Sequence, residues 1–146
     1  MKKLLLIFLL LFSLNITAQH GNRERIKALK VSFITEKLDL SEKEAQEFWP
    51  IYNDFENQIS NIRHKEIRAL KKEIKENADN MTNEKANTFI TKLNDAETRM
   101  LKLRLDFTKK LSSIIPAKKI VLLKVAEDDF KRKMFEEYKK KRKGGH

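Results

Sequence analysis

The side chains that most often do chemistry in proteins are sparse in this chain. Its histidines, His20, His64 and His146, lie far apart, and none has another His or an H-E-x-x-H glutamate at ligand spacing. The chain has no cysteine, which excludes thiolate nucleophiles, disulfides and cysteine-based metal sites. Because a metal site needs several convergent ligands, we expect neither a metal nor another cofactor.

Acidic and hydroxyl side chains follow the patterns of helix surfaces and helix ends. Glu127, Asp128 and Asp129 are flanked by Lys124 and Lys131, which favours solvated ion pairs over metal binding. The serines and threonines fall at expected helix starts and turns, without a His–Asp partner pattern. We therefore expect no catalytic residues and do not expect an enzyme.

Positive charge is the most pronounced property of the chain. Its 146 residues include 32 Lys and Arg against 21 Asp and Glu, a net charge of +11 at pH 7. The C-terminal basic run consists of Lys139, Lys140, Lys141, Arg142 and Lys143. Nucleic-acid binding also calls for stacking aromatics or a groove-entering motif, and Tyr138 is the one aromatic that adjoins the run. We expect a disordered basic tail over residues 139–146 and no nucleic-acid partner.

The first residues have the order of a secretory signal peptide. Lys2 and Lys3 precede an apolar stretch from Leu4 to Leu14, and small and polar residues follow up to Ala18. The apolar stretch is shorter than the roughly 20 residues that a membrane-spanning helix needs. We expect cleavage after Ala18 and export to the periplasm. Because two lysines are lost, the net charge of the mature chain falls from +11 to +9.

Helix signals fill the rest of the chain. The spacing of apolar residues predicts helices over residues 23–38, 42–76 and 83–113, and a fourth from Pro116 to Tyr138. No glycine lies between Asn22 and Lys143, so no residue there adopts a positive φ at low energetic cost, which argues against a hairpin-rich β fold. The predicted fold class is all-α.

Local motifs mark the ends of these helices. Ser41 and Glu44 have the S-x-x-E form of a capping box, and Thr82 is a candidate cap for the next helix. Pro116 fits the first turn of the last helix. Pro50 lies inside the second helix, where a proline removes an amide donor and predicts a kink. The alternative is that this helix starts later, close to Pro50.

The two long helices carry matching apolar stripes. The first stripe advances by about 3.6 residues per step, and the second alternates steps of three and four as a heptad seam does. Joined by the polar turn at residues 77–80, they predict an antiparallel hairpin. With a bend at Pro50, we expect four helices in an elongated, curved molecule. The stripes are Ala45, Phe48, Tyr52, Phe55, Ile59, Ile62, Ile67, Leu70 and Ile74, then Ala86, Phe89, Leu93, Ala96, Met100, Leu103 and Phe107, and in the fourth helix Ile120, Leu123, Phe130, Met134 and Tyr138.

The chain has more apolar residues than these stripes use. A wide buried face accounts for part of the surplus, and the rest predicts a dimer interface or an exposed apolar groove. Apolar surface bordered by Lys and Arg suits reversible binding of unfolded, often acidic chains, because cations raise the encounter rate and apolar patches supply affinity. The candidate client or dimer surface consists of Trp49, Ile51, Ile90, Leu101, Leu105, Val121, Leu122 and Val125.

An internal similarity relates the second and fourth helices. Residues 40–41 followed by 53–55 resemble residues 115–116 followed by 128–130 at a constant offset. Both segments begin a helix and place an aromatic residue at the same later position.

The segment from Leu38 to Gln46 resembles the L-T-x-x-Q motif of the Spy/CpxP family of periplasmic proteins. Leu40 and Ser41 match the Leu and Thr positions. Glu44 occupies the Gln position, and Gln46 follows two residues later. Residues 23–26, 33–38 and 48–52 resemble the relatives described as sensors of ECF-type sigma factors.

This resemblance implies four helices paired into a cradle-shaped dimer. It also implies ATP-independent holding of unfolded envelope proteins, or action as an adaptor of the envelope stress response. One alternative is a regulator in an ECF-type sigma factor pathway that acts through a membrane partner. Another is a Skp-like basic holdase, which needs a strand-built trimer core that the sequence does not predict. The expected organisation is a leader over residues 1–18, a helical Spy/CpxP-like domain over 19–138 and the basic tail.

Overall fold

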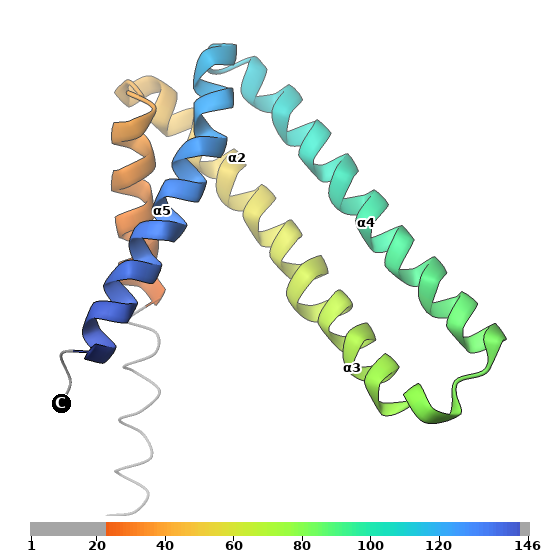
Figure 1. The fold of residues 1–146 in the computed structure, drawn as a ribbon. Coiled ribbons are helices and arrows are strands. Elements are labelled where there is room, and N and C mark those ends of the chain that lie inside the picture. The colour runs from red at the N-terminus through yellow and green to blue at the C-terminus, as the bar shows by residue number, and fades with distance from the viewer. Residues whose placement is uncertain (1–22, 144–146) are drawn as a thin grey trace, which may run out of the picture. The chain divides into compact units, whose positions relative to one another are not determined.

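The computed structural model describes residues 23–143. Every regular element in that range is helical and none is a strand, which confirms the all-α fold class. The chain divides into two compact units, Ser41–Ile120 and a second unit that combines Met1–Leu40 with Val121–His146 (Figure 1). The expected leader and residues 144–146 lie outside the described residues.

The first described helix covers residues 23–37, close to its predicted bounds. It ends in a Schellman motif, in which the Leu40 N–H donates to the Thr35 carbonyl at 3.1 Å and the Asp39 N–H to the Glu36 carbonyl at 3.1 Å. Asp39 adopts a φ of 47° to make this turn. This left-handed position is reached without glycine because Asp enters the region more readily than most residues.

Helix α2 (Glu42–Ser60) begins where the capping box predicts. The Ser41 hydroxyl accepts from the Glu44 N–H at 3.3 Å, and the Glu44 carboxylate accepts from the Ser41 N–H at 2.7 Å. The helix then continues through Pro50. The alternative start near Pro50 is therefore wrong.

The helix predicted over residues 42–76 contains a π-helical segment. This segment, η1 (Asn61–Ile67), lies between α2 and α3 (Arg68–Glu76). A π turn takes up one more residue than an α turn. The apolar stripe steps by five residues from Ile62 to Ile67, so both side chains still join the same core cluster. The expectation of a uniform α-helix is wrong at this point.

The predicted hairpin is confirmed (Figure 1). The short 3₁₀ helix η2 (Ala78–Asn80) leads into α4 (Asn83–Ser112), which packs back along α2, η1 and α3. The Thr82 side chain accepts from the Lys85 N–H at 3.2 Å, which confirms the predicted cap. The core cluster of the hairpin contains Ile59, Ile62, Ala96 and Met100, with Phe55, Ile67 and Leu103 packed against it.

Helix α5 (Ala117–Lys143) starts one residue later than predicted. The Pro116 carbonyl accepts from the Lys119 N–H at 2.9 Å, so Pro116 caps the helix instead of lying in its first turn. Residues 139–143 are helical, which corrects the expected disordered tail. Tyr138 is 59% exposed and does not take the core position that the stripe predicts.

In the second unit, the helix over residues 23–37 packs against α5. The rings of Phe33 and Phe130 lie 5.7 Å apart, and Lys133 Nζ lies 5.4 Å from the centre of the Phe33 ring. Burial weakens toward the N-terminal end of that helix, where Ile26 and Leu29 are about two-fifths exposed.

Candidate functional site

An aromatic cluster connects α2 to α4. Tyr52 stacks on Phe48 with ring centres 5.4 Å apart, and it meets the edge of Phe107 at 6.0 Å. Phe107 stacks on Phe55 at 4.1 Å with nearly parallel rings. Trp49, predicted as part of an exposed surface, is half-buried and packs edge-on against Phe48 and Tyr52 at 5.0 and 5.3 Å.

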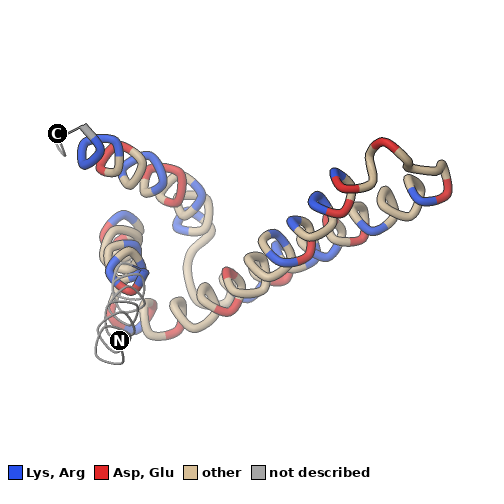
Figure 2. The backbone as a smooth tube through the Cα atoms, turned by 90° about the horizontal axis from the view of Figure 1, so that it is seen from below, with Lys and Arg blue, Asp and Glu red and all other residues tan. Residues whose placement is uncertain are grey.

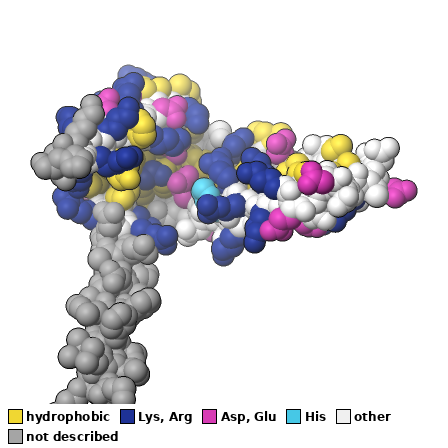
Figure 3. Space-filling model, turned by 60° about the horizontal axis from the view of Figure 1, so that its bottom comes forward, with side chains coloured by type: hydrophobic (Ala, Val, Ile, Leu, Met, Phe, Trp, Pro, Cys, Tyr) yellow, Lys and Arg dark blue, Asp and Glu magenta, His cyan; other side chains and the backbone are white. Residues whose placement is uncertain are grey.

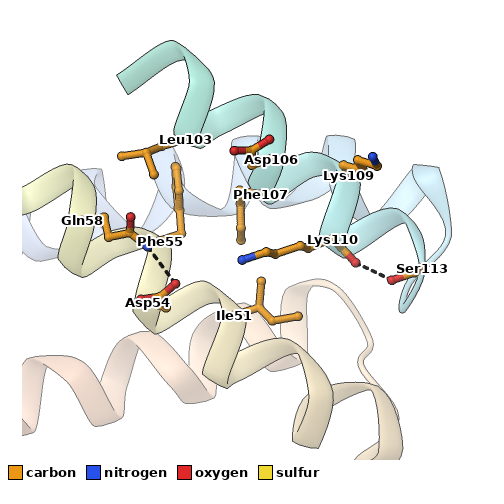
Figure 4. Close-up of a pocket in the computed structure, with 10 residues that line it drawn as sticks. All are labelled: Ile51, Asp54, Phe55, Gln58, Leu103, Asp106, Phe107, Lys109, Lys110 and Ser113. Carbon is orange, nitrogen blue, oxygen red and sulfur yellow. Dashed lines mark hydrogen bonds between the residues drawn. The ribbon is translucent and has the colours of Figure 1, made fainter. Parts of the chain in front are cut away.

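A hollow of about 560 Å³ opens beside this cluster. Ile51 and Phe55 of α2 face Leu103 and Phe107 of α4 across it (Figure 4). All four side chains are half-buried, so they pack against one another and still meet solvent. The hollow therefore has an apolar floor that a side chain of another polypeptide can contact.

The rim of the hollow carries charges of both signs, from Asp54, Asp106, Lys109 and Lys110. Gln58 Nε2 donates to Asp54 Oδ2 at 2.8 Å. Lys109 and Lys110 occupy the last turn of α4, where cations offset the negative end of the helix dipole. This apolar floor and charged rim favour the binding of a ligand whose apolar group is flanked by charged groups.

The face of α4 opposite the core carries a second apolar row. Ile90, Leu101 and Leu105 are 55%, 54% and 62% exposed. Separations of eleven and four residues place them on one side of the helix. Lys102 and Arg104, both exposed, border the row. Leu101 and Leu105 are one turn apart and form an exposed pair, whereas Ile90 lies about 16 Å along the same side, with the polar residues Asn94 and Glu97 between them.

The remaining predicted surface residues belong to the other compact unit. Val121, Leu122 and Val125 of α5 are 69%, 38% and 54% exposed. Phe135, at 59% exposed, was missed by the sequence reasoning, and Lys139 Nζ lies 4.5 Å from the centre of its ring. The signal was its spacing of two heptads from Val121, which places both residues on a similar side of α5.

The motif residues build a junction between two helix starts. Glu44 Oε2 accepts from Lys119 Nζ at 2.8 Å, and both side chains are about four-fifths buried. This hydrogen bond, helped by the one from the Ser41 N–H, lowers the pKa of Glu44. Leu40, which precedes Ser41 in the sequence, is buried. The Gln46 side-chain amide donates to the Glu42 carboxylate at 3.4 Å. The motif therefore has a structural role.

Sequence reasoning did not find the partnership between Glu44 and Lys119. The two residues are 75 positions apart. That separation is the offset of the internal similarity, so they occupy equivalent third positions of α2 and α5. The similarity was the signal that could have paired them.

Hydroxyl side chains along α4 are engaged by their own helix. The hydroxyls of Thr88, Thr91, Thr98, Thr108 and Ser112 donate to the carbonyl four residues earlier. Within the described residues, no cluster of His, Asp or Glu side chains could hold a metal ion.

The chain matches no family model, and no curated protein or solved structure is significantly similar to it. The resemblance to the Spy/CpxP family therefore stays a prediction. Among the helices of the described range, none is long and apolar enough to cross a membrane.

Proposed function

We propose that this protein binds unfolded polypeptides in the periplasm without catalysis or ATP, as a Spy/CpxP-like chaperone or adaptor of the envelope stress response. The observation that supports this most directly is the apolar row of Ile90, Leu101 and Leu105 on the outer face of α4. Exposed apolar side chains that lie together, as Leu101 and Leu105 do, favour contact with other molecules, whereas isolated ones are common on any protein surface.

The energetics of this row suit reversible holding. Covering one half-exposed Leu or Ile contributes about 1 kcal/mol, so three give about 3 kcal/mol before the cost of ordering the client. That energy favours brief, non-specific contacts. The charges of Lys102 and Arg104 beside the row raise the encounter rate with acidic chains.

The hollow between α2 and α4 supplies a second contact of the same kind. Its apolar floor takes a single large side chain, and its mixed rim accepts charged neighbours on either side. An extended unfolded chain presents such side chains at intervals, whereas most folded proteins bury them. The apolar row and the hollow therefore both suit unfolded polypeptides.

An aggregation assay tests this function. A denatured client protein is diluted into buffer with an equimolar amount of this protein and no ATP, and light scattering is followed. We expect the protein to slow the rise in scattering. Leu101→Ser combined with Leu105→Ser should require about thirty times more protein for the same effect, because about 2 kcal/mol of apolar contact is lost.

The matched control changes polar positions of the same helix face, Asn94→Ser with Thr98→Ser, and should leave suppression unchanged. Absence of any suppression by the unsubstituted protein contradicts the chaperone function. Co-purification from membranes with one specific protein would then favour the signalling alternative, a regulator in a sigma factor pathway. Sedimentation of the protein at tens of micromolar tests the proposed homodimer, and a monomer counts against it.

A further inference from the structure

Most basic side chains of η1 and α3 lie on one side of these helices, away from Glu66 and Glu73. One side is a shallow hollow of about 610 Å³ with cationic walls. Its lining consists of His64, Lys65, Arg68, Ala69, Lys71, Lys72 and Lys75. The other side, which α3 shares with α4, is lined by Glu66 and Glu73. Figure 2 shows Lys and Arg recurring along the hairpin that contains η1 and α3. In Figure 3, dark blue Lys and Arg side chains gather beside the cyan histidine.

The fold draws an acidic group away from the cationic face. Both terminal nitrogens of Arg99, on α4, donate to the carboxylate of Glu66. Glu66 lies inside the π segment, next to Lys65 in sequence. The pairing with Arg99 therefore directs this carboxylate toward α4, while Lys65 and Arg68 line the opposite hollow.

The spacing of the cations in this row slightly destabilises the helix. Its members recur every three or four residues, where like charges repel one another. All of them are exposed, and Lys72 forms an exposed ion pair with Glu76, with the Lys72 Nζ 3.7 Å from the Glu76 carboxylate. An anionic surface placed against the row would relieve this repulsion.

We propose that the cationic face of η1 and α3 docks the protein on the surface of an anionic phospholipid bilayer. Clusters of four to eight Lys and Arg on a helix bind anionic headgroups through many additive contacts. The row spans about 15 Å from Lys65 to Lys75, along one side of the helix. Such an extended row can meet several headgroups at once.

The composition of the row favours lipid over other anions. All but one of its Lys and Arg residues are Lys, which act as point charges and not as bidentate forks for a fixed carboxylate. Lysine point charges suit lipid headgroups that move in a fluid bilayer better than the carboxylates of an acidic polypeptide held in fixed positions. The row contains no aromatic side chain on which a nucleic-acid base would stack.

Vesicle sedimentation tests this docking. The protein, expressed from its complete sequence and purified in its processed form, is mixed with phosphatidylcholine vesicles with or without about one-third phosphatidylglycerol, at an ionic strength of about 0.1 M. We expect binding at least tenfold tighter to the anionic vesicles. An apolar N-terminus, if retained, binds both vesicle types, so the difference between them reports electrostatic binding, which the variants below assign to a surface.

Substitution of three cations of the row should remove this preference. Arg68→Gln, Lys71→Gln and Lys75→Gln together should weaken binding to anionic vesicles roughly 100-fold. Gln keeps helix propensity and these side chains are exposed, so the circular dichroism spectrum should not change. The control variant, Lys139→Gln with Lys140→Gln and Lys141→Gln, removes the same charge from α5 and should weaken binding only a few-fold.

Three results overturn the proposal. One is equal binding to neutral and anionic vesicles. Another is an equal loss in the α5 control, which would show that total charge decides. The third is binding to polyglutamate but not to anionic vesicles, which would assign the face to acidic polypeptides. Because none of these readouts involves a denatured client, their failure leaves the proposed holding function to its own assay.

Discussion

At the residue scale, the Glu44 carboxylate connects two groups from distant parts of the chain. Its carboxylate accepts from the Ser41 N–H and from Lys119 Nζ. A lysine in the first turn of a helix faces the positive end of the helix dipole, so Lys119 needs a compensating anion. Glu44 supplies it and caps its own helix at the same time.

This arrangement predicts a pH-dependent stability. The pKa of Glu44 is lowered from its ordinary value of 4.5, mainly by the hydrogen bond from Lys119. Its contribution is therefore complete above pH 4.5 and is lost as the pH falls through the folded-state pKa. We expect Glu44→Gln to lower Tm at neutral pH and to reduce the further loss of Tm on acidification, measured by circular dichroism.

Glu47→Gln is the matched control, since it removes the same charge from an exposed position of α2. Its Tm should fall on acidification as the unsubstituted protein's does. An unchanged acid profile in the Glu44 variant would show that the link to Lys119 does not stabilise the fold.

How much of this junction the sequence predicts depends on the distance between partners along the chain. Ser41 and Glu44 are three positions apart, so their capping box is readable from a short motif and is confirmed. The same holds for Thr82, which caps α4. Lys119 lies 75 positions from Glu44, and a contact over that distance depends on how the helices pack. Local chemistry is predictable at this scale, whereas partners from distant segments are not.

At the element scale, the π segment decides which side chains face the core. The sequence predicted a stripe with a mean step of about 3.6, and an average of this kind hides one step of five. That step, from Ile62 to Ile67, was visible in the sequence but had no structural meaning until η1 was seen. Helix existence and the hairpin were therefore predictable, while the local winding was not.

Deletion of one residue from η1 tests this view. Without His64, which is exposed, the stripe steps by four from Ile62 to Ile67, as an α-helix requires. We expect the variant to keep its helix content and a cooperative thermal transition, with Tm within a few degrees of the unsubstituted protein.

The comparison is deletion of exposed Lys102 from the regular helix α4. It rotates every later residue by about 100°, which removes Phe107 and buried Leu111 from the core face. This variant should lose several kcal/mol of unfolding free energy. A similar loss in the His64 deletion would show that the π winding itself is required.

At the scale of the whole molecule, the two compact units differ in how their chain segments are joined. The unit Ser41–Ile120 is continuous in sequence, whereas the other combines the two ends of the chain. The sequence predicted a single helical domain over residues 19–138 and could not show this division, because all helices carry similar apolar stripes. The distribution of charge was also hidden, because Glu66, Glu73 and Glu76 offset part of the positive charge of the cationic row in a sum along the chain.

The continuous unit should fold by itself. A fragment of residues 41–120 retains the capping box, the Thr82 cap, the core cluster and the link from Glu44 to Lys119. We expect it to be helical and to melt cooperatively, measured by circular dichroism. A fragment that is largely unstructured at low temperature would contradict the division into units.

The separations of the contacts along the hairpin have a consequence for the order in which it assembles. Near the turn, Lys85 Nζ donates to Asn77 Oδ1, a residue eight positions earlier in the chain. At the other end of the hairpin, the hydrogen bond between Lys119 and Glu44 closes a loop of 75 positions. Because the entropic cost of closing a loop rises with its length, the turn end forms early and pairing proceeds toward the open end. Glu44 and Lys119 meet after most of the interface has formed. The hydrogen bond between Glu44 and Lys119 therefore mainly lowers the rate of unfolding and has little influence on the rate of folding.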